Sequence, residues 1–328
     1  MKAHVRRYTG IYEYVACKIM TIRSFINIAS LIALAAVLSV ACTQKSGSCR
    51  SGEGITLQIL GSGGPIADDD RASSGYLLWI EGESRVLIDA GGGTFLRFGE
   101  AGANFEELDF VGLSHLHTDH SADLPALLKS GSFSDRLRPL PIAGPDGDGA
   151  FPGLNDYLRA TLSADGGAYG YLSGFLDGTA DTPLLTPREV QRGAPSLVYT
   201  SEDLRIDALH VPHGIVPAVA FRVTTGDQVF VFATDQNGDD PAFIEFATGA
   251  SILVMHMVVP DGASGVARRL HAPPGVIGEI AANVAPGKLV LSHLMARSLR
   301  DLEQNVALVQ ARYKGDIIVA EDLVCVSP

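Results

Sequence analysis

Short apolar runs, separated by polar and glycine-rich breaks, follow one another from residue 55 to the end of the chain. Such runs, rich in Val, Ile, Leu and Phe and bounded by turn residues, are typical of buried strands. The pattern predicts strands at 56–60, 76–80, 85–88, 110–113, 140–143, 197–200, 205–211, 218–223, 228–233, 252–255, 288–292 and 317–320. The turn at 81–84 would join the second and third of these strands as a hairpin.

Helix-like segments lie between and after these strands. They predict one helix that begins at Thr94 and others at 122–129, 274–284 and 298–313. Pro274 suits the first turn of its helix, because a backbone N–H is not needed there. Strands that arrive in runs, with helices between and after them, predict a layered α/β sandwich.

The residues before 55 follow a different pattern. The stretch 25–41 is apolar over 17 residues, fewer than the ~20 that a transmembrane helix needs. Arg23 precedes it and small residues end it, which is the pattern of a secretory signal peptide. We therefore expect a signal peptide at 1–41, with translation starting at Met20 and 1–19 as extra upstream sequence. An uncleaved membrane anchor is the alternative.

The residues Leu38–Cys42 (LSVAC) resemble the lipobox of bacterial lipoproteins, with the favoured leucine one place early. The resemblance implies a lipid on Cys42 and export to the periplasmic face of a bacterial membrane. The protein would contact the membrane only through this lipid anchor. A polar tether would then cover 42–54, and the folded domain would cover 55–328.

Composition and charge narrow the class of protein. The chain is 46% hydrophobic and 19% charged, which is typical of a globular protein and excludes a disordered chain. The whole chain has a formal charge of −12. Residues 1–41 contain five basic residues and one acidic residue. Without them, 20 basic and 36 acidic residues remain, which gives a net charge of −16. A nucleic-acid partner would need a positive face, so we expect none.

Two cysteines, Cys49 and Cys325, lie near the two ends of the domain that would remain after export. In an oxidising compartment they could form a disulfide bond. Their spacing equally allows two free thiols.

A cluster of potential metal ligands directly follows the strand at 110–113. The segment Ser114–His120 (SHLHTDH) contains three histidines and an aspartate. Residues two apart in an extended segment point the same way, so His115 and His117 can hold one ion from the same side. A helix that begins at Ser121 would turn Asp119 and His120 toward a second position beside it. Imidazole and carboxylate ligands suit zinc, with Mn²⁺ or iron as alternatives.

This segment resembles the HxHxDH signature of the metallo-β-lactamase superfamily, and the similarity extends over 55–323. The resemblance implies a four-layer αββα sandwich with a dinuclear zinc site and hydrolase activity. Two neighbouring cations would lower the pKa of a shared water and give a hydroxide nucleophile. It also implies the ligands, which are His115, His117 and His213 for one zinc, Asp119, His120 and His293 for the other, and Asp235 as the bridge. Asp119 would also take part in catalysis, and Asp89 matches a structural aspartate.

Three further histidines are explained by a resemblance to the ribonuclease Z branch of the superfamily, seen around 210–222. His271 matches the additional catalytic histidine of that branch and would act as a general acid on the leaving oxygen; the alternative is an exposed residue at a helix start. His256 and His210 are expected to support the ligands or to pack. Met257 stands where the branch usually has an acid.

Ribonuclease Z itself fits poorly, because only 22 residues lead from His213 to Asp235, too few for the arm with which that enzyme holds transfer RNA. Exported relatives of the branch include arylsulfatase-like and cyclic-nucleotide phosphodiesterase-like enzymes. We therefore expect the substrate to be a small phosphodiester or sulfate ester. A lactonase or β-lactamase-type hydrolase and a metal-binding lipoprotein without turnover are alternatives.

Two features leave more than one interpretation open. The Gly-rich insert at 163–182, with Tyr169, Tyr171 and Phe175, would either cap the site with aromatic walls or form a plain surface loop. Related enzymes are often dimers, so a homodimer is compatible with the resemblance.

Overall fold

The structure, a computed structural model, describes residues 49–51, 54–179 and 181–328. The expected signal peptide at 1–41, the lipidation site Cys42 and most of the tether at 42–54 lie outside these residues. The described residues belong to one compact unit. Within them, every helix is too short or too polar to cross a membrane.

Two sheets form the centre of the fold. The first contains Ile55–Gly61 (β1), Gly75–Ile80 (β2), Glu83–Ile88 (β3), Phe110–Gly112 (β4), Leu140–Pro145 (β5), Leu185–Val190 (β6) and Cys325–Val326 (β14), in the order β14-β1-β2-β3-β4-β5-β6. The second contains Ser196–Thr200 (β7), Leu204–His213 (β8), Val216–Thr225 (β9), Gln228–Phe232 (β10), Ile252–His256 (β11), Lys288–Ser292 (β12) and Asp316–Val319 (β13), in the order β13-β12-β11-β10-β9-β8-β7.

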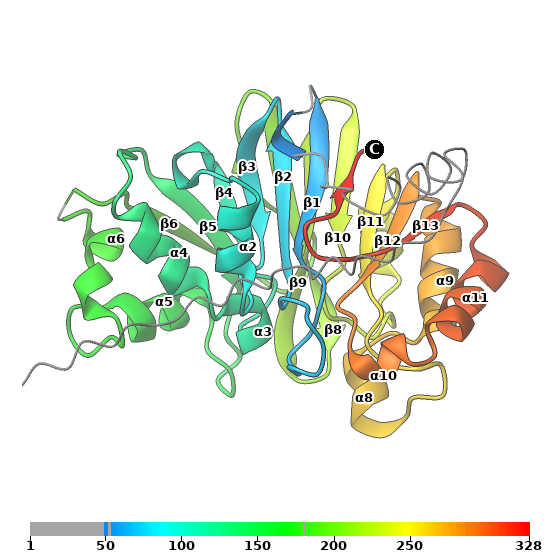
Figure 1. Ribbon diagram of the computed structural model, residues 1–328. Coiled ribbons are helices and arrows are strands. Elements are labelled where there is room, and N and C mark those ends of the chain that lie inside the picture. The colour runs from blue at the N-terminus through cyan, green and yellow to red at the C-terminus, as the bar shows by residue number, and fades with distance from the viewer. Residues whose placement is uncertain (1–48, 52–53, 180) are drawn as a thin grey trace, which may run out of the picture. The chain divides into compact units, whose positions relative to one another are not determined.

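Helices cover the outer faces of both sheets. They are Thr94–Glu100 (α2), Thr118–Ser121 (α3), Leu124–Gly131 (α4), Leu154–Leu162 (α5), Gly174–Asp177 (α6), Ala242–Ala247 (α7), Gly265–Leu270 (α8), Pro274–Val284 (α9), Ala296–Leu299 (α10) and Leu302–Arg312 (α11). Short 3-10 turns occur at Cys49–Ser51 (η1), Phe105–Glu107 (η2) and Gly170–Leu172 (η3). Figure 1 shows α4, α5 and α6 on one side of the strands and α9 and α11 on the other. The expected αββα sandwich is confirmed.

The hydrophobic core has three layers that match this architecture. Phe221 and Phe232 from the second sheet pack with Tyr76 from the first, between the sheets. Separate clusters lie under the outer helices, with Leu127 on the first sheet and Ile277 on the second. Each such buried side chain stabilises the fold by about 1.5–3 kcal/mol relative to an exposed one.

The strand directions place the site. Strands β3 to β6 run parallel to one another, and so do β10 to β13. Residues that follow the carboxyl ends of parallel strands meet at one edge of a sheet. Asp89, Asp235 and His293 come one to three residues after the ends of β3, β10 and β12. Figure 1 shows the short helices α3, α8 and α10 gathered at the lower end of the strands.

The structure differs from the sequence-based elements at several points. Strand β6 and helices α5, α7 and α8 were not expected. The helix expected at 298–313 is two helices, because the chain turns at Arg300–Asp301 between α10 and α11. The helix that follows the histidine segment already begins at Thr118, so Asp119 and His120 lie inside α3 rather than before a helix.

The insert at 163–182 packs on the outer face of the first sheet and does not cover the site. Phe175 is fully buried and packs edge-on against Phe105, with 6.5 Å between the ring centroids. Leu172 is also buried, whereas Tyr171 is exposed. Its two buried apolar side chains therefore hold the insert against the domain, and a cap is the wrong interpretation.

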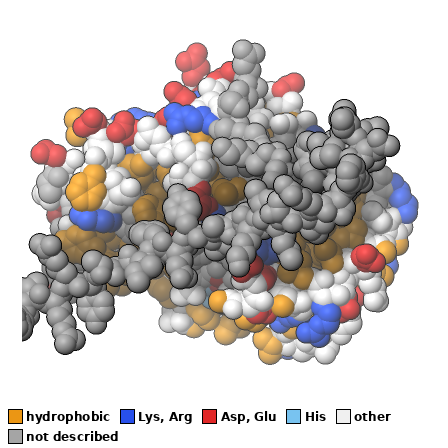
Figure 2. All heavy atoms as spheres, in the orientation of Figure 1, with side chains coloured by type: hydrophobic (Ala, Val, Ile, Leu, Met, Phe, Trp, Pro, Cys, Tyr) orange, Lys and Arg blue, Asp and Glu red, His pale blue; other side chains and the backbone are white. Residues whose placement is uncertain are grey.

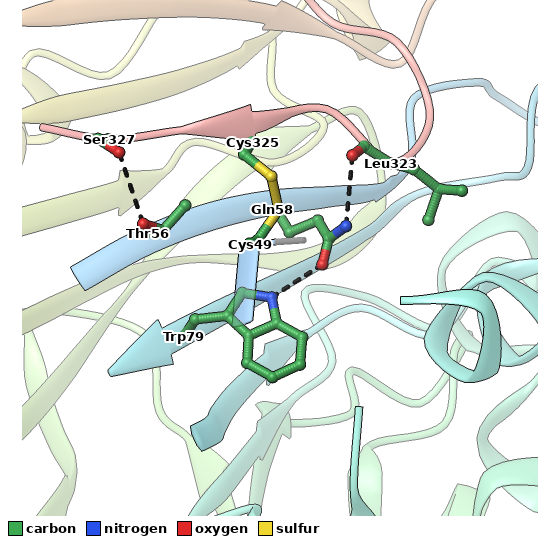
Figure 3. The surroundings of a disulfide bond; sticks show 7 residues. All are labelled: Cys49, Thr56, Gln58, Trp79, Leu323, Cys325 and Ser327. Atoms are coloured by element: carbon green, nitrogen blue, oxygen red, sulfur yellow. Dashed lines mark hydrogen bonds between the residues drawn. A yellow bond between two sulfur atoms is a disulfide. The ribbon is translucent and has the colours of Figure 1, made fainter. Parts of the chain in front are cut away.

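Cys49 and Cys325 form a disulfide bond that joins η1 to β14 (Figure 3). Gln58 on β1 links neighbouring segments near this bond. Its Nε2 donates to the carbonyl of Leu323, and its Oε1 accepts from Trp79 Nε1 on β2. Arg50 donates to the carbonyl of Gly102. Residues 49–51 of the expected tether are therefore part of the fold, because the disulfide and Arg50 hold them there.

Candidate metal centre

The four side chains predicted to hold the first ion lie together. The ligand atoms of His115, His117, His213 and Asp235 all lie within 4.8 Å of one another. His115 Nε2 lies 2.9 Å from His117 Nδ1, and Asp235 Oδ2 lies 3.6 Å from His213 Nε2. These residues come from the loop after β4, the end of β8 and the loop after β10. This grouping agrees with the prediction for the first site.

The side chains predicted to hold the second ion lie beside the first group. Asp119 Oδ2 is 3.6 Å from His120 Nε2 and 3.2 Å from His293 Nε2. Asp235 lies between the two groups, with Oδ2 3.8 Å from His120 Nε2 and Oδ1 3.5 Å from His293 Nε2. Its two oxygens thus face both groups, as a bridging ligand requires.

His256 also lies within ligand distance of His120, Asp235 and His293. Both of its ring nitrogens are already engaged, because Nδ1 is 2.7 Å from Asp235 Oδ1 and Nε2 is 2.9 Å from the Tyr76 hydroxyl. Tyr76 in turn donates to Ser292 Oγ. This chain holds the Asp235 carboxylate in place, which supports the positioning role expected for His256.

Hydrogen bonds to the Nδ1 atoms, on the side of the rings away from the metal position, orient two of the ligand histidines. His120 Nδ1 lies 2.8 Å from Asp89 Oδ2, and His213 Nδ1 lies 2.9 Å from the carbonyl of Leu270. Asp89 also accepts from the backbone N–H and the hydroxyl of Ser114. A hydrogen bond from Nδ1–H leaves Nε2 with its lone pair, which is the form that binds a metal.

The donor set fits metal ions. Among the described residues, His120 Nε2 and His213 Nε2 are buried and have no hydrogen-bond partner. Buried polar atoms are normally paired, since leaving one unpaired is costly. Both nitrogens face Asp235 across distances too long for a hydrogen bond. A cation held between imidazole and carboxylate would satisfy all three groups.

The electrostatics of the protein alone keep the carboxylates ionised. Burial opposes ionisation of Asp235, but His293, His271 and the other nearby histidines outweigh it and hold its pKa well below the usual range. Burial also raises the pKa of Asp119. The hydrogen bond from His293 and the positive charges of His120 and His293 outweigh this effect and lower the pKa to about 2. Burial and the neighbouring His120 hold the pKa of His115 well below its usual value. Burial opposes protonation of His120, but the Asp89 carboxylate outweighs it and raises the pKa of His120 to about 9. The ionised carboxylates and neutral His115 are thus ready for a cation, whereas a cation bound at His120 would displace a proton.

Three non-glycine residues at this edge have a left-handed backbone conformation. Asp89, Thr234 and His293 have φ values of 62°, 56° and 56°, a region that residues with a Cβ adopt at some cost. Each lies one or two residues after the end of a strand. Strain of this kind persists where the surrounding structure enforces it, and it is typical of functional sites.

Comparison with known proteins agrees with this geometry. The family model described as "Beta-lactamase superfamily domain" matches residues 84–294. The chain belongs to the metallo-β-lactamase superfamily. With its cluster of histidine and aspartate ligands, it is a metal-dependent hydrolase of this fold.

Individual relatives extend the comparison over most of the domain. Ribonuclease Z of Mycobacterium bovis (strain BCG / Pasteur 1173P2) is 28% identical over 281 residues, which are 82% of this chain and 96% of the relative. The metallo-β-lactamase fold protein YhfI from Bacillus subtilis has a TM-score of 0.66 at 22% identity and covers 84% of this chain and 99% of its own. The short form of human tRNase Z has a TM-score of 0.64 at 21% identity, with coverage of 83% and 98%.

A cavity of about 490 Å³ opens over the ligands of this hydrolase. His271 lines it and is 8% exposed, with Nδ1 3.8 Å from Asp235 Oδ1. Burial, only partly opposed by Asp235, lowers the pKa of His271 to about 4. His271 is therefore in the site, as expected, and is not an exposed residue at a helix start. His210 instead contacts Asp146 and the carbonyl of Val190, which suits the expected packing role.

Arg297 also lines the cavity, and sequence reasoning did not identify it. Its Nε donates to the carbonyl of Val258. It makes no ion pair with any carboxylate among the described residues. Its position in α10, four residues after His293, is the signal that could have pointed to it.

Proposed function

We propose that this hydrolase holds two zinc ions and cleaves a small phosphodiester or sulfate ester. The observation that carries the proposal is the position of the predicted ligands around Asp235: His115, His117 and His213 lie together with it, and Asp119, His120 and His293 lie together beside it. His115, His117 and His213 would hold one ion, Asp119, His120 and His293 the other, and Asp235 would bridge them. Two bound cations would activate a water molecule and stabilise the negative charge that develops on the ester.

The remaining polar residues of the cavity have roles that suit an anionic ester. His271 would donate a proton to the departing oxygen, which matters most when the leaving group is a poor one. A bound anion would oppose the lowering of its pKa, because a nearby negative charge favours the imidazolium form. Arg297 has no acidic partner in the part of the chain that the structure describes, so its guanidinium would bind an oxygen of the phosphate or sulfate group.

Several features support a small substrate rather than RNA. The chain after residue 41 carries a net charge of −16, which opposes polyanion binding. The span from His213 to Asp235 is almost entirely taken up by β9 and β10 and their short turns. Figure 2 shows acidic and basic side chains interspersed on the visible face.

The place of action is proposed to be the periplasm, with Cys42 lipidated. The disulfide between Cys49 and Cys325 supports export, because structural disulfides persist in oxidising compartments. Cys42, the residue that would carry the lipid, lies seven residues before Cys49, where η1 of the folded domain begins.

The test uses the zinc-loaded protein with bis(p-nitrophenyl) phosphate and p-nitrophenyl sulfate. We expect turnover of at least one of them and loss of turnover in Asp119→Ala, which should still be folded and unfold cooperatively in the metal-free form. Asp156→Ala is the matched control, since Asp156 is exposed on α5 and pairs only with Arg159. Bound zinc without turnover on esters, lactones and β-lactams would make the protein a metal-binding protein instead. Turnover confined to lactones or β-lactams would overturn the substrate class.

A further inference from the structure

Apart from Thr118, His271 and Arg297, the cavity residues that are not predicted metal ligands are apolar. Leu116 lies between two ligands, Leu270 lies at the end of α8, and Val258 and Met295 follow β11 and β12. Pro65 completes this lining from the loop after β1. None of these side chains can bind a phosphate or sulfate group, so they face some other part of the substrate.

Two exposed isoleucines are close in sequence to residues that line the cavity. Ile215 is 75% exposed in the turn between β8 and β9, two residues after the ligand His213. The turn lies against α8, because Gly214 N–H donates to the carbonyl of Arg269, next to the cavity residue Leu270. Ile66 is 50% exposed and directly follows Pro65. Two separate loops therefore place an exposed isoleucine next to a residue of the cavity.

Local structure does not explain Ile215. Tight turns favour Gly, Asn, Asp and Ser, whereas a β-branched residue is stiff and favours a strand. Gly214, with φ of 62°, already meets the conformational demand of the turn. An isoleucine that is exposed at an unfavourable position and adjacent to the site is better explained by contact with a ligand.

We propose that the substrate carries an alkyl group, which lies along Leu116 and Leu270 and extends over Ile215 and Ile66. This inference rests on the proposed function and specifies its substrate class. The substrate would be an amphiphilic ester: its anionic group would bind the metals and Arg297, and its hydrocarbon part would contact the apolar residues just named, which we call the apolar wall. Among the residues that line the cavity, histidine supplies the only aromatic rings, and Phe, Tyr and Trp do not occur there. A nucleotide base, which stacks on Phe, Tyr or Trp, would have no such partner here.

The test measures binding and turnover along a chain-length series. Linear alkylphosphonates from methyl to hexyl are titrated into the zinc-loaded protein by calorimetry, below their critical micelle concentrations. The p-nitrophenyl alkyl phosphodiesters of the same lengths are assayed in parallel, so that the leaving group stays constant. We expect affinity and kcat/KM to rise by about two- to four-fold per methylene, because each buried methylene favours binding by a similar factor.

The variants Ile215→Ser and Ile66→Ser test the surface part of the wall. The ratio of hexyl to methyl affinity should fall several-fold in each. Leu96→Ser is the matched control, because Leu96 is 63% exposed on α2 and does not line the cavity; its ratio should equal that of the unmodified protein.

The outcomes separate this inference from the proposed function. Hydrolysis of the diesters with no dependence on chain length would overturn the inference and leave the hydrolase assignment intact. A chain-length dependence that survives both isoleucine substitutions would overturn the role of Ile215 and Ile66. Absence of phosphonate binding together with absence of hydrolysis of both the diesters and p-nitrophenyl sulfate would overturn the proposed function, and this inference with it.

Discussion

Asp89→Asn is the substitution that tests how the second ligand group is held. Asp89 is 1% exposed and accepts hydrogen bonds from the backbone N–H of Ser114 at 2.7 Å, from the Ser114 hydroxyl at 2.8 Å and from His120 Nδ1 at 2.8 Å. Asparagine has one acceptor oxygen in place of two. Its NH₂ group would face either the Ser114 N–H or the His120 ring, and both are donors.

The expected magnitude follows from these contacts. A hydrogen bond to a charged group contributes about 1.5–3 kcal/mol, and a buried donor left unpaired costs about 1–3 kcal/mol. We therefore expect the metal-free variant to lose about 2–4 kcal/mol in its free energy of unfolding. If His120 instead receives a hydrogen bond at Nδ1, its proton moves to Nε2, the nitrogen that faces the metal. Zinc affinity should then fall by about 10- to 100-fold.

Two measurements separate these effects. Urea unfolding in the presence of a chelator gives the stability of the metal-free protein, and competition with a zinc-binding dye gives the zinc affinity. Asp109→Asn is the matched control, because Asp109 is a buried carboxylate that pairs with Arg85 and Arg138 just before β4, at the other end of that strand from the ligands. It should lose stability and keep its zinc affinity. Equal zinc affinity in Asp89→Asn and the unmodified protein would refute the role given to Asp89.

Three further predictions concern the disulfide and the cavity. Replacing Cys49 and Cys325 by serine should lower the free energy of unfolding by about 2–5 kcal/mol, because the bond closes a long loop, with a sequence separation of 276; equal urea midpoints for the oxidised protein and the variant would contradict this. His271→Ala should reduce kcat about 100-fold or more on esters with alkyl leaving groups and much less on p-nitrophenyl esters; an equal loss on both would show that His271 does not protonate the leaving oxygen. Arg297→Ala should raise KM about 10-fold or more for an anionic diester and leave KM for a neutral lactone nearly unchanged; equal effects on both would mean that Arg297 acts through the fold.

The ligand residues could be predicted from the sequence because they lie next to strong local signals. His115, His117, Asp119 and His120 lie within six residues and follow an apolar strand. Asp235 and His293 follow the ends of the parallel strands β10 and β12, which brings their side chains to one edge. His213 is the last residue of β8, which is antiparallel to its neighbours. The structure brings all of these residues together at one edge; the local pattern indicated the first four, and the resemblance to the superfamily implied His213, Asp235 and His293.

Other features depend on contacts that no local pattern contains. The insert at 163–182 has the composition of a loop, and only the packing of Phe175 against Phe105 shows that it belongs to the core. Helices α7 and α8 are six residues each, too short for a clear amphipathic period. Arg297 belongs to the site because α10 turns it toward the cavity, which cannot be read from an isolated arginine.

The disulfide bond between Cys49 and Cys325 could not be predicted from a local sequence pattern either. The sequence left Cys49 and Cys325 equally compatible with free thiols, since their spacing says nothing about distance. In the structure, β14 pairs with β1, with Gln58 opposite Cys325. This pairing brings the end of the chain beside η1 and allows the bond.

The central claim, a dinuclear zinc centre that performs hydrolysis, is tested most directly by a metal titration. The protein is freed of metal with a chelator, zinc is added in steps, and bound zinc and turnover of bis(p-nitrophenyl) phosphate are measured on the same samples. The account predicts that turnover rises with zinc and reaches its maximum at about two bound ions per chain, and that Asp119→Ala binds less zinc and stays inactive. Full turnover with one bound ion, or without zinc, would contradict it.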